Sequence, residues 1–475
     1  MDEGKFKRIF FKEFKSIPMN SQDTICSIST PQGIGAIAII RMSGPQSFTI
    51  AQPLFDFDFA ELRPSVTKYA ELKDKGQLID QVMVVKYAAP HSYTGEDMVE
   101  ISCHGSTYIQ RKILELLIEH GCRMANPGEY TMRAFMNGKM DLPQAEAVGD
   151  LIDSQSEASH HLAVNQLKGA FSARLKALRT QFVEFASLLE LELDFSEEDV
   201  QFANRERLSS LLAEIKSEVN GLIDSFKAGN AIKSGVPVVI IGKPNVGKST
   251  LLNTLLHDER AIVSNIPGTT RDTIEDVLNI GGVTFRFIDT AGIRTSEDEI
   301  ENFGIERTYQ AVAKADIILY MVDATATSIE EIQEEIDFLK EVVDMADKKL
   351  ILVANKIDSL TEMPRQLMHL KEYEVVYISA KRNVNIEAIT DQLLAVAATH
   401  RMSDQAMMTN VRHYDNFLKI RYSIENIERG FAENVSTDLI AIDVRDALHH
   451  LGVVTGEIAT DEILNTVFGR FCIGK

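Results

Sequence analysis

A glycine-rich loop between an apolar strand and a helix constrains this chain more than any other stretch. The residues before it, Val238–Ile241, are apolar and mostly β-branched, as is typical of a buried strand. Gly242–Ser249 then matches the spacing G-x-x-x-x-G-K-[ST], and residues 250–256 continue as a predicted helix. Backbone N–H groups of such a loop converge on phosphate oxygens at a positively polarised helix N-terminus. The stretch therefore predicts a phosphate-binding loop in a nucleotide-binding α/β sheet.

The loop also supplies side chains with chemical roles. Lys248 is expected to reach the β- and γ-phosphates as a catalytic cation, and the Ser249 hydroxyl is expected to bind Mg²⁺. The expected nucleotide contacts in this loop are Asn245, Val246, Gly247, Lys248, Ser249 and Thr250.

Two later motifs favour guanine over adenine. Asn355–Asp358 follows a predicted strand, and a carboxylate at Asp358 can accept two hydrogen bonds from N1 and N2 of guanine. Adenine lacks that pair of donors. The Lys356 stem can lie over the base, and backbone N–H groups of Ser379–Lys381 can meet guanine O6. The expected base contacts are Asn355, Lys356, Asp358, Ser379, Ala380 and Lys381.

Two polar segments lie between the phosphate loop and the guanine motifs. Gly268–Asp272 offers Thr270 as a further Mg²⁺ ligand. In Asp289–Gly292, Asp289 can hold the Mg²⁺ shell through water, and the Gly292 N–H can meet the γ-phosphate. The next residue is Ile293, which cannot orient the attacking water as a glutamine does in Ras-like switches. Another group must therefore orient the water and neutralise the developing charge.

Composition excludes several classes of protein. The chain has 475 residues and a formal net charge of -21, which argues against binding nucleic acid by bulk electrostatics. Any RNA must meet a local basic patch or be held by a partner. No apolar run approaches the length of a membrane span, so no membrane partner is expected. The 4 cysteines lack C-x-x-C spacing, which favours reduced thiols and a cytoplasmic location.

The pattern along the chain predicts a multidomain protein. In the nucleotide-binding part, strands are predicted at Val238–Ile241, Thr284–Ile288, Ile317–Val322, Leu350–Ala354 and Val375–Ile378. Helical periodicity on both sides of this part suggests that it is inserted into one all-α domain. The expected divisions are a disordered extension (1–18), an N-terminal α/β domain (19–142), the first part of the helical domain (143–232), an inserted Ras-like P-loop α/β GTPase domain (233–400), and the second part of the helical domain with its Cys-Ile-Gly-Lys ending (401–475).

Four stretches outside the GTPase motifs resemble one family, the MnmE (TrmE) tRNA-modification GTPases. They are Asp23–Ile25 with Gly35–Gly44, Ser92–Asp97 with Glu100 and His104–Gly105, Pro127–Lys139, and the terminal Phe471–Lys475. The resemblance covers the chain from Met19 to Lys475, and these stretches are far more specific than the GTPase motifs.

The resemblance implies that residues 19–142 form a folate-binding domain that also dimerises the protein. Arg41, Glu100 and Lys139 would surround 5-formyl- or 5,10-methylene-tetrahydrofolate, with Lys475 reaching the same region. Cys472 would lie near that pocket as a functional, catalytic thiol.

The resemblance also implies a replacement for the missing glutamine. Asn245 would help to bind K⁺, and Ser264, Ile266 and Thr269 would complete that site, with Ser264 and Thr269 also among the GTP contacts. The K⁺ would neutralise transition-state charge when two GTPase domains meet. Glu301 would orient the attacking water through a second water.

The implied partner is the FAD-containing protein MnmG, which would form a heterotetramer with this protein and hold much of the tRNA. Together they would add an aminomethyl or carboxymethylaminomethyl group to C5 of the wobble uridine in certain tRNAs, with folate as the one-carbon donor. An Era- or Der-like ribosome-assembly GTPase is the alternative, because it shares Gly268–Asp272 and lacks the glutamine. It would, however, predict a Lys- and Arg-rich RNA-binding module at the C-terminus. A stand-alone folate enzyme is a third hypothesis, against which the intact GTPase motif set argues.

Overall fold

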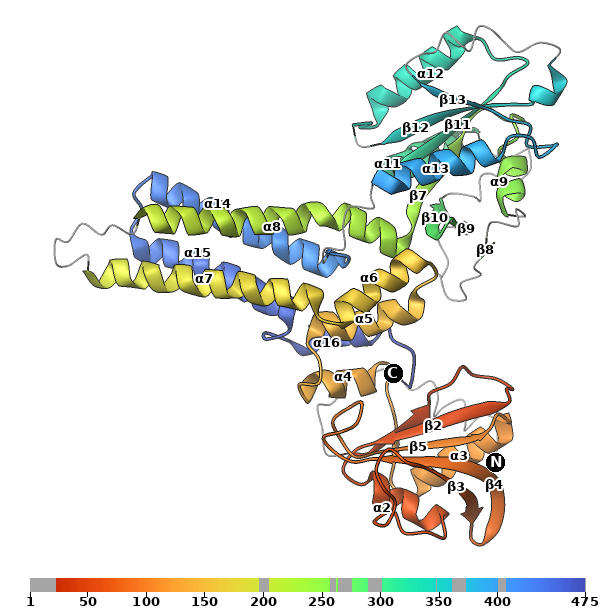
Figure 1. Ribbon diagram of the computed structural model, residues 1–475. Helices are drawn as coiled ribbons and strands as arrows, with labels where there is room; N and C mark the ends of the chain where they lie inside the picture. The colour runs from red at the N-terminus through yellow and green to blue at the C-terminus, as the bar shows by residue number, and fades with distance from the viewer. Residues whose placement is uncertain are drawn as a thin grey trace. The chain divides into compact units, whose positions relative to one another are not determined.

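The computed structural model describes residues 23–195, 205–256, 262–263, 276–288, 301–346, 348–360, 373–399 and 407–474. The chain divides into two compact units, one of residues 1–149 with 448–475 and one of residues 150–447. Figure 1 labels their helices and strands. The predicted extension, 1–18, lies outside the described residues.

The first unit is built on a six-stranded sheet in the order β3-β4-β5-β2-β1-β6. All described neighbours in it are antiparallel except β1 and β6. Its strands are β1 (Ile25–Ile28), β2 (Ile37–Ser43), β3 (Thr67–Asp74), β4 (Gln77–Tyr87), β5 (Met98–His104) and β6 (Arg123–Met124). Helix α3 (Thr107–Glu119) buries Ile113, Leu116 and Leu117 in the core that also contains Ile40 and Ile101 from the strands. One face of the sheet therefore carries the core of this unit, as the mixed α/β pattern predicts.

The C-terminal helix completes the first unit. A second apolar cluster joins α4 (Glu129–Met136) and the start of α5 (Leu142–Asp153) to α16 (Asp461–Phe468), through Met132, Leu142 and Phe468. Short helical pieces of this unit are α2 (Ser47–Ala51) and η1 (Gln52–Leu54). Residues more than 300 positions apart in the sequence thus share one core, because α16 is amphipathic and buries its apolar face there.

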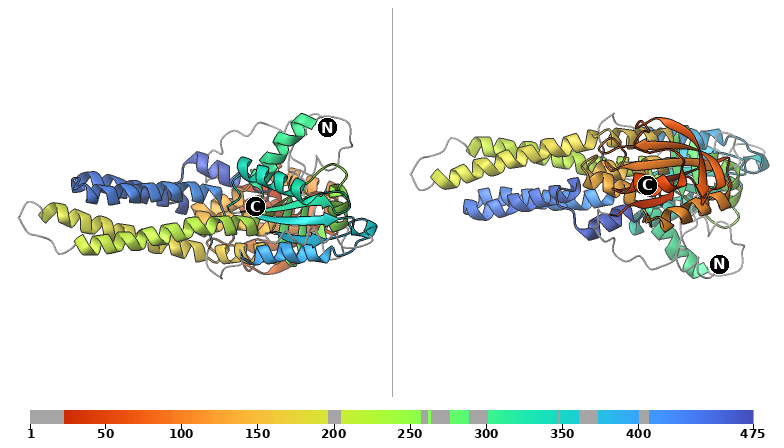
Figure 2. Two further views of the ribbon diagram at one scale, coloured as in Figure 1. Left: turned by 90° about the horizontal axis from the view of Figure 1, so that it is seen from above. Right: turned by 90° about the horizontal axis from the view of Figure 1, so that it is seen from below.

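Long helices form part of the second unit. They are α6 (Glu157–Leu167), α7 (Ala170–Phe195), α8 (Arg205–Ser234) and α14 (Val411–Ala432), and α15 (Thr437–Thr455) crosses from this unit to the first. Both α7 and α14 pack against α8, and Figure 2 shows these helices side by side from two directions. Their buried residues, such as Phe182, Ile215 and Ile420, recur at helical spacing. No helix among the described residues is long and apolar enough to cross a membrane.

A seven-stranded sheet in the order β13-β12-β11-β7-β10-β9-β8 forms the rest of the second unit. Its strands are β7 (Val236–Ile241), β8 (Ile262–Val263), β9 (Asp276–Ile280), β10 (Val283–Phe287), β11 (Ile317–Asp323), β12 (Lys349–Asn355) and β13 (Glu374–Tyr377). The pairs from β13 to β10 are parallel, and β9 and β8 are antiparallel. Each of the five predicted strands therefore coincides with an observed strand to within two residues.

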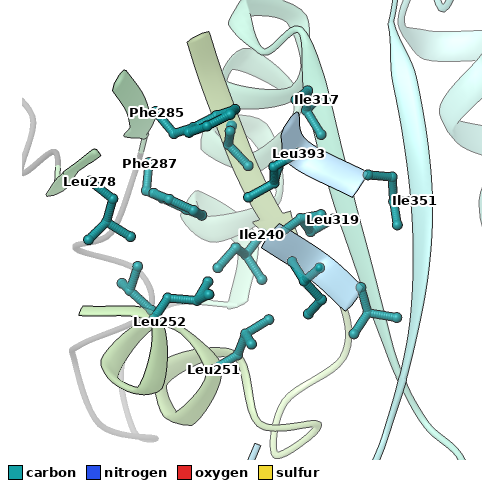
Figure 3. Close-up of a cluster of buried hydrophobic side chains, with 14 of the residues drawn as sticks. Ile240, Leu251, Leu252, Leu278, Phe285, Phe287, Ile317, Leu319, Ile351 and Leu393 are labelled. Carbon is teal, nitrogen blue, oxygen red and sulfur yellow. The ribbon is translucent and has the colours of Figure 1, made fainter. Parts of the chain in front are cut away.

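Helices cover both faces of this sheet. One core lies under α9 (Lys248–Leu256) and α13 (Glu387–Thr399), where Leu251 and Leu393 meet Ile240 (Figure 3). The opposite core lies under α11 (Glu301–Lys314) and α12 (Ile329–Val342). Alternate residues of β7 point to the two cores, which is why this strand reads as a continuous apolar run. This is the predicted P-loop α/β domain, and it occurs between the helices of the second unit.

Candidate functional site

The phosphate loop leaves β7 at Ile241 and enters α9 at Lys248. Gly247 has φ +105, and a Cβ there would lie 2.3 Å from Nδ2 of Asn355. That amide is buried and bonded, so it cannot move aside. Asn245 has φ +62, a left-handed conformation that asparagine tolerates. The loop conformation therefore depends on Gly247, which the motif specifies, and on Asn245, at a position that the motif leaves open.

Lys248 lies against the loop that precedes it. Its Nζ donates to the carbonyl oxygens of Gly242 at 2.6 Å and Lys243 at 2.9 Å. Burial lowers the pKa of the Lys248 ammonium. The cation is thus held over the loop whose N–H groups would meet phosphate, next to Ser249 and Thr250 in the first turn of α9.

Asn355, at the end of β12, joins three loops through one side chain. Its Nδ2 donates to the carbonyl oxygen of Val246 at 2.7 Å, and its Oδ1 accepts from the N–H of Ala380 at 3.0 Å. Asn355 is only 3% exposed. The phosphate loop, the Asn355–Asp358 loop and the Ser379–Lys381 loop are therefore brought together at the carboxyl edge of the parallel strands, where ligands bind in such sheets.

The Asp358 carboxylate is fixed from the neighbouring loop. Ser379 donates its hydroxyl to Oδ1 at 2.6 Å, and Nε of Arg382 lies 3.4 Å from Oδ2. The hydrogen bond from Ser379 is the main cause that lowers the pKa of Asp358, and Arg382 and Lys381 act in the same direction. The carboxylate therefore stays ionised and can only accept hydrogen bonds, as recognition of a guanine edge requires.

Lys356 has a partner that the motif pattern does not contain. Its Nζ lies 2.7 Å from Oδ2 of Asp323, at the end of β11. The backbone of Lys356 has φ 69 and ψ 30, a left-handed conformation that costs a residue other than glycine roughly 1–3 kcal/mol. A charged residue at a strand's carboxyl end was the only sequence signal that could have pointed to Asp323.

Several predicted site residues lie outside the described part of the chain. They are Ser264, Ile266, Thr269, Thr270, Asp289, Gly292 and Lys475. Glu301 begins helix α11, and its side chain also lies outside what the structure describes. The roles predicted for these residues stay predictions.

In the first unit, the structure brings two of the predicted folate-binding residues together. Arg41 and Glu100 are register partners on β2 and β5. Nε of Arg41 donates to Oε1 of Glu100 at 2.8 Å, and NH2 lies 2.7 Å from the same oxygen. Tyr87 donates its hydroxyl to Oε2 of Glu100 at 3.3 Å. Burial, and next the charge of Glu100, raise the pKa of Tyr87, so the phenol remains a donor.

Aromatic rings flank the Arg41 guanidinium, which the sequence analysis did not foresee. Its Cζ lies 5.7 Å from the ring centre of Tyr93 and 5.6 Å from that of Tyr130. Tyr130 is fully buried, donates its hydroxyl to the carbonyl oxygen of Arg41 at 2.8 Å, and accepts from Ser27. The guanidinium is therefore oriented by two rings as well as by Glu100.

The C-terminal residues dock beside this pair. The carbonyl oxygen of Gly474 accepts from NH1 of Arg41 at 3.3 Å and from the Ser29 hydroxyl at 3.4 Å. The Cys472 carbonyl accepts from the N–H of Gly128 at 3.5 Å, and its thiol is exposed. Gly474, which contacts Arg41, is two positions after Cys472, and the role predicted for Cys472 stays a prediction. Nζ of Lys139 donates to the Pro90 carbonyl at 3.1 Å, and its role in folate binding stays a prediction.

A partly buried ion network connects helix α4, which carries Tyr130, with neighbouring segments. NH2 of Arg133 lies 2.7 Å from Asp23 and 3.0 Å from Glu129, and NH2 of Arg123 lies 2.6 Å from Glu129. Burial acts to raise the pKa of Glu129, but hydrogen bonds and charge, chiefly from Arg123, outweigh it and lower the pKa. No sequence pattern predicted this network, because its members come from three separate segments.

The sheet, the phosphate loop and the Asn355–Asp358 loop define a P-loop protein of the GTPase class. A family model described as "MnmE helical domain" matches residues 142–472, and one described as "GTP-binding protein TrmE N-terminus" matches residues 24–139. The chain belongs to the MnmE family of tRNA modification GTPases.

Individual relatives agree with the family models. The tRNA modification GTPase MnmE of Flavobacterium johnsoniae is 47% identical, over 96% of this chain and 100% of the relative. That of Bacteroides fragilis (strain ATCC 25285) is also 47% identical, with the same coverage. Among solved structures, the G domain of the T. maritima FeoB iron transporter is 26% identical over 34% of this chain and 98% of its own, with a TM-score of 0.25. A score of that size supports no conclusion about this chain.

Proposed function

We propose that this protein hydrolyses GTP at the phosphate loop and uses the reaction in tRNA modification. The assignment of a nucleotide site depends mainly on Asn355. Its side-chain amide forms hydrogen bonds to the backbone of both Val246 and Ala380. A nucleotide with phosphates at one end and guanine at the other would span the loops that Asn355 joins. The ionised Asp358 carboxylate supports guanine as the base.

The residues around the phosphate loop have different roles in hydrolysis. Lys248 binds the β- and γ-phosphates, and the hydroxyls of Ser249 and Thr270 suit Mg²⁺, a hard cation that prefers oxygen ligands. Asp289 would help to hold the Mg²⁺, and the Gly292 N–H would bind the γ-phosphate. Mg²⁺ supplies charge neutralisation at the phosphates.

A second cation would replace the arginine finger of other GTPases. The oxygen donors of Asn245, Ser264, Ile266 and Thr269 are those that a K⁺ ion takes, and the left-handed Asn245 lies in the phosphate loop itself. K⁺ supplies positive charge at the transition state. Glu301 orients the attacking water when two GTPase domains of a homodimer meet. We expect hydrolysis to be much faster in K⁺ than in Na⁺ at equal ionic strength, and equal rates would refute the K⁺ site.

The pair Arg41–Glu100 would bind a tetrahydrofolate, 5-formyl or 5,10-methylene. A carboxylate can accept from pterin N–H groups, and cations such as Lys139 and Lys475 can meet the glutamate tail. The rings of Tyr93 and Tyr130 keep the guanidinium oriented. Calorimetric titration of the full chain with 5-formyltetrahydrofolate tests this site. Wild type should bind and Glu100→Gln should bind much more weakly, whereas equal affinities would reject Glu100 as a ligand.

The complete proposal joins both sites. With MnmG, in a heterotetramer, the protein would form the (carboxymethyl)aminomethyl group at C5 of wobble uridine, using the folate one-carbon unit and the exposed thiol of Cys472. Three buried free cysteines favour a reducing, cytoplasmic setting. Nucleoside mass spectrometry of tRNA from a strain lacking the gene should show loss of the modified uridine. Wild type should restore the modified uridine and Lys248→Ala should not. Unchanged nucleosides in the deletion strain would contradict the proposal.

A further inference from the structure

Asp323 lies outside every GTPase motif, yet its side chain contacts the Asn355–Asp358 loop. Its Oδ2 pairs with Nζ of Lys356 at 2.7 Å. Its Oδ1 accepts from the N–H of Thr325 at 2.9 Å and from the Thr325 hydroxyl at 2.6 Å. One oxygen is therefore fixed by the turn after β11, and the other holds the lysine. Both oxygens of the Asp323 carboxylate therefore have partners, which fix the orientation of the side chain.

We propose that Asp323 is a positioning residue for guanine recognition, which holds Lys356 so that its aliphatic stem lies across the face of the base. The inference rests on the proposed function, because it takes Asn355–Asp358 to be the guanine loop. Asp323 itself touches no part of the nucleotide. It acts through Lys356.

The sheet register explains why an anchor can work from this position. β11 and β12 are parallel neighbours with Asp323 opposite Asn355, and the N–H of Ala324 donates to the Asn355 carbonyl at 2.9 Å. Lys356 directly follows Asn355, so Asp323 and Lys356 lie at the same edge of the sheet. Asp323 and Lys356 are brought together by backbone pairing before any ligand contributes.

Lys356 needs such an anchor for two reasons. Its backbone is left-handed, which disfavours lysine, and it begins the single turn η3 (Ile357–Ser359). Its side chain has many rotamers, and fixing them on binding weakens the affinity unless they are fixed beforehand. The ion pair with Asp323 fixes the end of the chain in advance, so the nucleotide meets a stem that is already ordered.

The charge of the pair is partly shielded from water. The Asp323 side chain is 18% exposed and that of Lys356 is 37% exposed. Burial acts to raise the pKa of Asp323, but hydrogen bonds from Lys356 and Thr325 outweigh it and the pKa lies below its ordinary value. The carboxylate is therefore charged at neutral pH, and the pair is stronger than a fully exposed one.

Substitution of Asp323 should weaken nucleotide binding without altering which base is read. Asp323→Asn keeps the shape of the side chain and removes its charge, so a smaller fraction of the protein has Lys356 in place. We expect Kd for GDP and GTP to rise roughly fivefold. The ratio of GDP to IDP affinity should not change, because Asp358 and not Lys356 reads the amino group that IDP lacks. Asp323→Glu keeps the charge and should recover most of the affinity.

A matched control comes from the other end of the same strand. Asp316 directly precedes β11 and lies away from the phosphate and guanine loops. Asp316→Asn should bind GDP as wild type does. Equal GDP affinities for Asp323→Asn and wild type would overturn the inference.

A double-mutant cycle tests whether Asp323 acts through Lys356. In a Lys356→Ala background there is no ammonium to position, so Asp323→Asn should change the Kd for GDP by less than about twofold. A merely structural role of Asp323 would predict the same loss in both backgrounds. If the loss persists without Lys356, the inference is wrong.

The readout also separates this inference from the proposed function. The full-length, nucleotide-free protein is titrated with fluorescent GDP and then competed with GTP, ATP and IDP. If ATP competes as well as GTP on wild type, the guanine site itself is refuted. If wild type is selective for guanine and Asp323→Asn is indistinguishable from it, the guanine site stands and the role of Asp323 is refuted.

Discussion

Asn355 offers the sharpest test of how the nucleotide edge is held together. We consider Asn355→Ala, which removes the side-chain amide and leaves the backbone of β12 in place. The hydrogen bonds to Val246 and Ala380 are both lost. No change in the phosphate loop sequence is involved, so any effect on nucleotide binding must arise from the missing amide.

The magnitude follows from burial. Val246 is 5% exposed and Ala380 is 3% exposed, so the carbonyl of one and the N–H of the other lose a partner where water has little access. Each orphaned group costs roughly 1–3 kcal/mol, so two of them cost about 2–6 kcal/mol, with a middle value of about 4 kcal/mol. For the P-loop α/β domain, this loss of stability corresponds to a fall in the melting temperature of Asn355→Ala of about 10 °C.

A control for this variant is Asn279→Ala in the same sheet. Asn279 makes one exposed hydrogen bond, from Nδ2 to the Gln155 carbonyl at 2.9 Å, so its loss should cost below about 1 kcal/mol. Thermal unfolding is followed by circular dichroism with and without GDP. Asn355→Ala should have a much lower melting temperature than the control, and GDP should raise that temperature only slightly. Equal melting temperatures for the two variants would refute the inference that the Asn355 side chain holds these loops together.

Three further outcomes follow from the structure. In the folded protein the pKa of Glu129 is below its ordinary value of 4.5. The stability that Glu129 contributes is therefore complete above pH 4.5 and is lost as pH falls through the lower pKa of the folded state. In Glu129→Gln, the free energy of unfolding should depend less on pH in that range. Lys248→Ala should abolish GTP hydrolysis in a phosphate-release assay while circular dichroism stays unchanged, and residual turnover near wild type would contradict its role. Gly474→Ala should reduce tRNA modification but not GTP hydrolysis, because a Cβ at φ +104 would lie 2.5 Å from the Ile28 carbonyl and displace the tail.

Local chemistry explains which parts of the site could be predicted. Phosphate binding needs a glycine loop between a strand and a helix, and all of its parts lie within about a dozen consecutive residues. The strand β7 is recognisable because both of its faces are buried. The residues Asn355 and Asp358 are predictable as a motif, but the bonds from Asn355 to Val246 and from Ser379 to Asp358 are tertiary contacts.

Other parts had no local signal. Asp323 and Lys356 are 33 positions apart and meet only because β11 and β12 are parallel neighbours. Arg133 and Asp23 are 110 positions apart. The ring of Tyr93 reaches Arg41 from a loop, and that of Tyr130 reaches it from the first turn of helix α4. None of these pairs has a spacing that a sequence pattern could reveal.

The amino-acid sequence by itself determined the fold class and the chemistry of the phosphate loop, because both depend on short-range periodicity and on residue types at fixed spacing. The tertiary structure alone decided which charged and polar groups are paired. It joined Gly474 to Arg41 and Asp323 to Lys356. Pairing of this kind depends on sheet register and on how segments distant in sequence pack together. The sequence around a carboxylate or guanidinium does not indicate which partner it will contact in the folded protein.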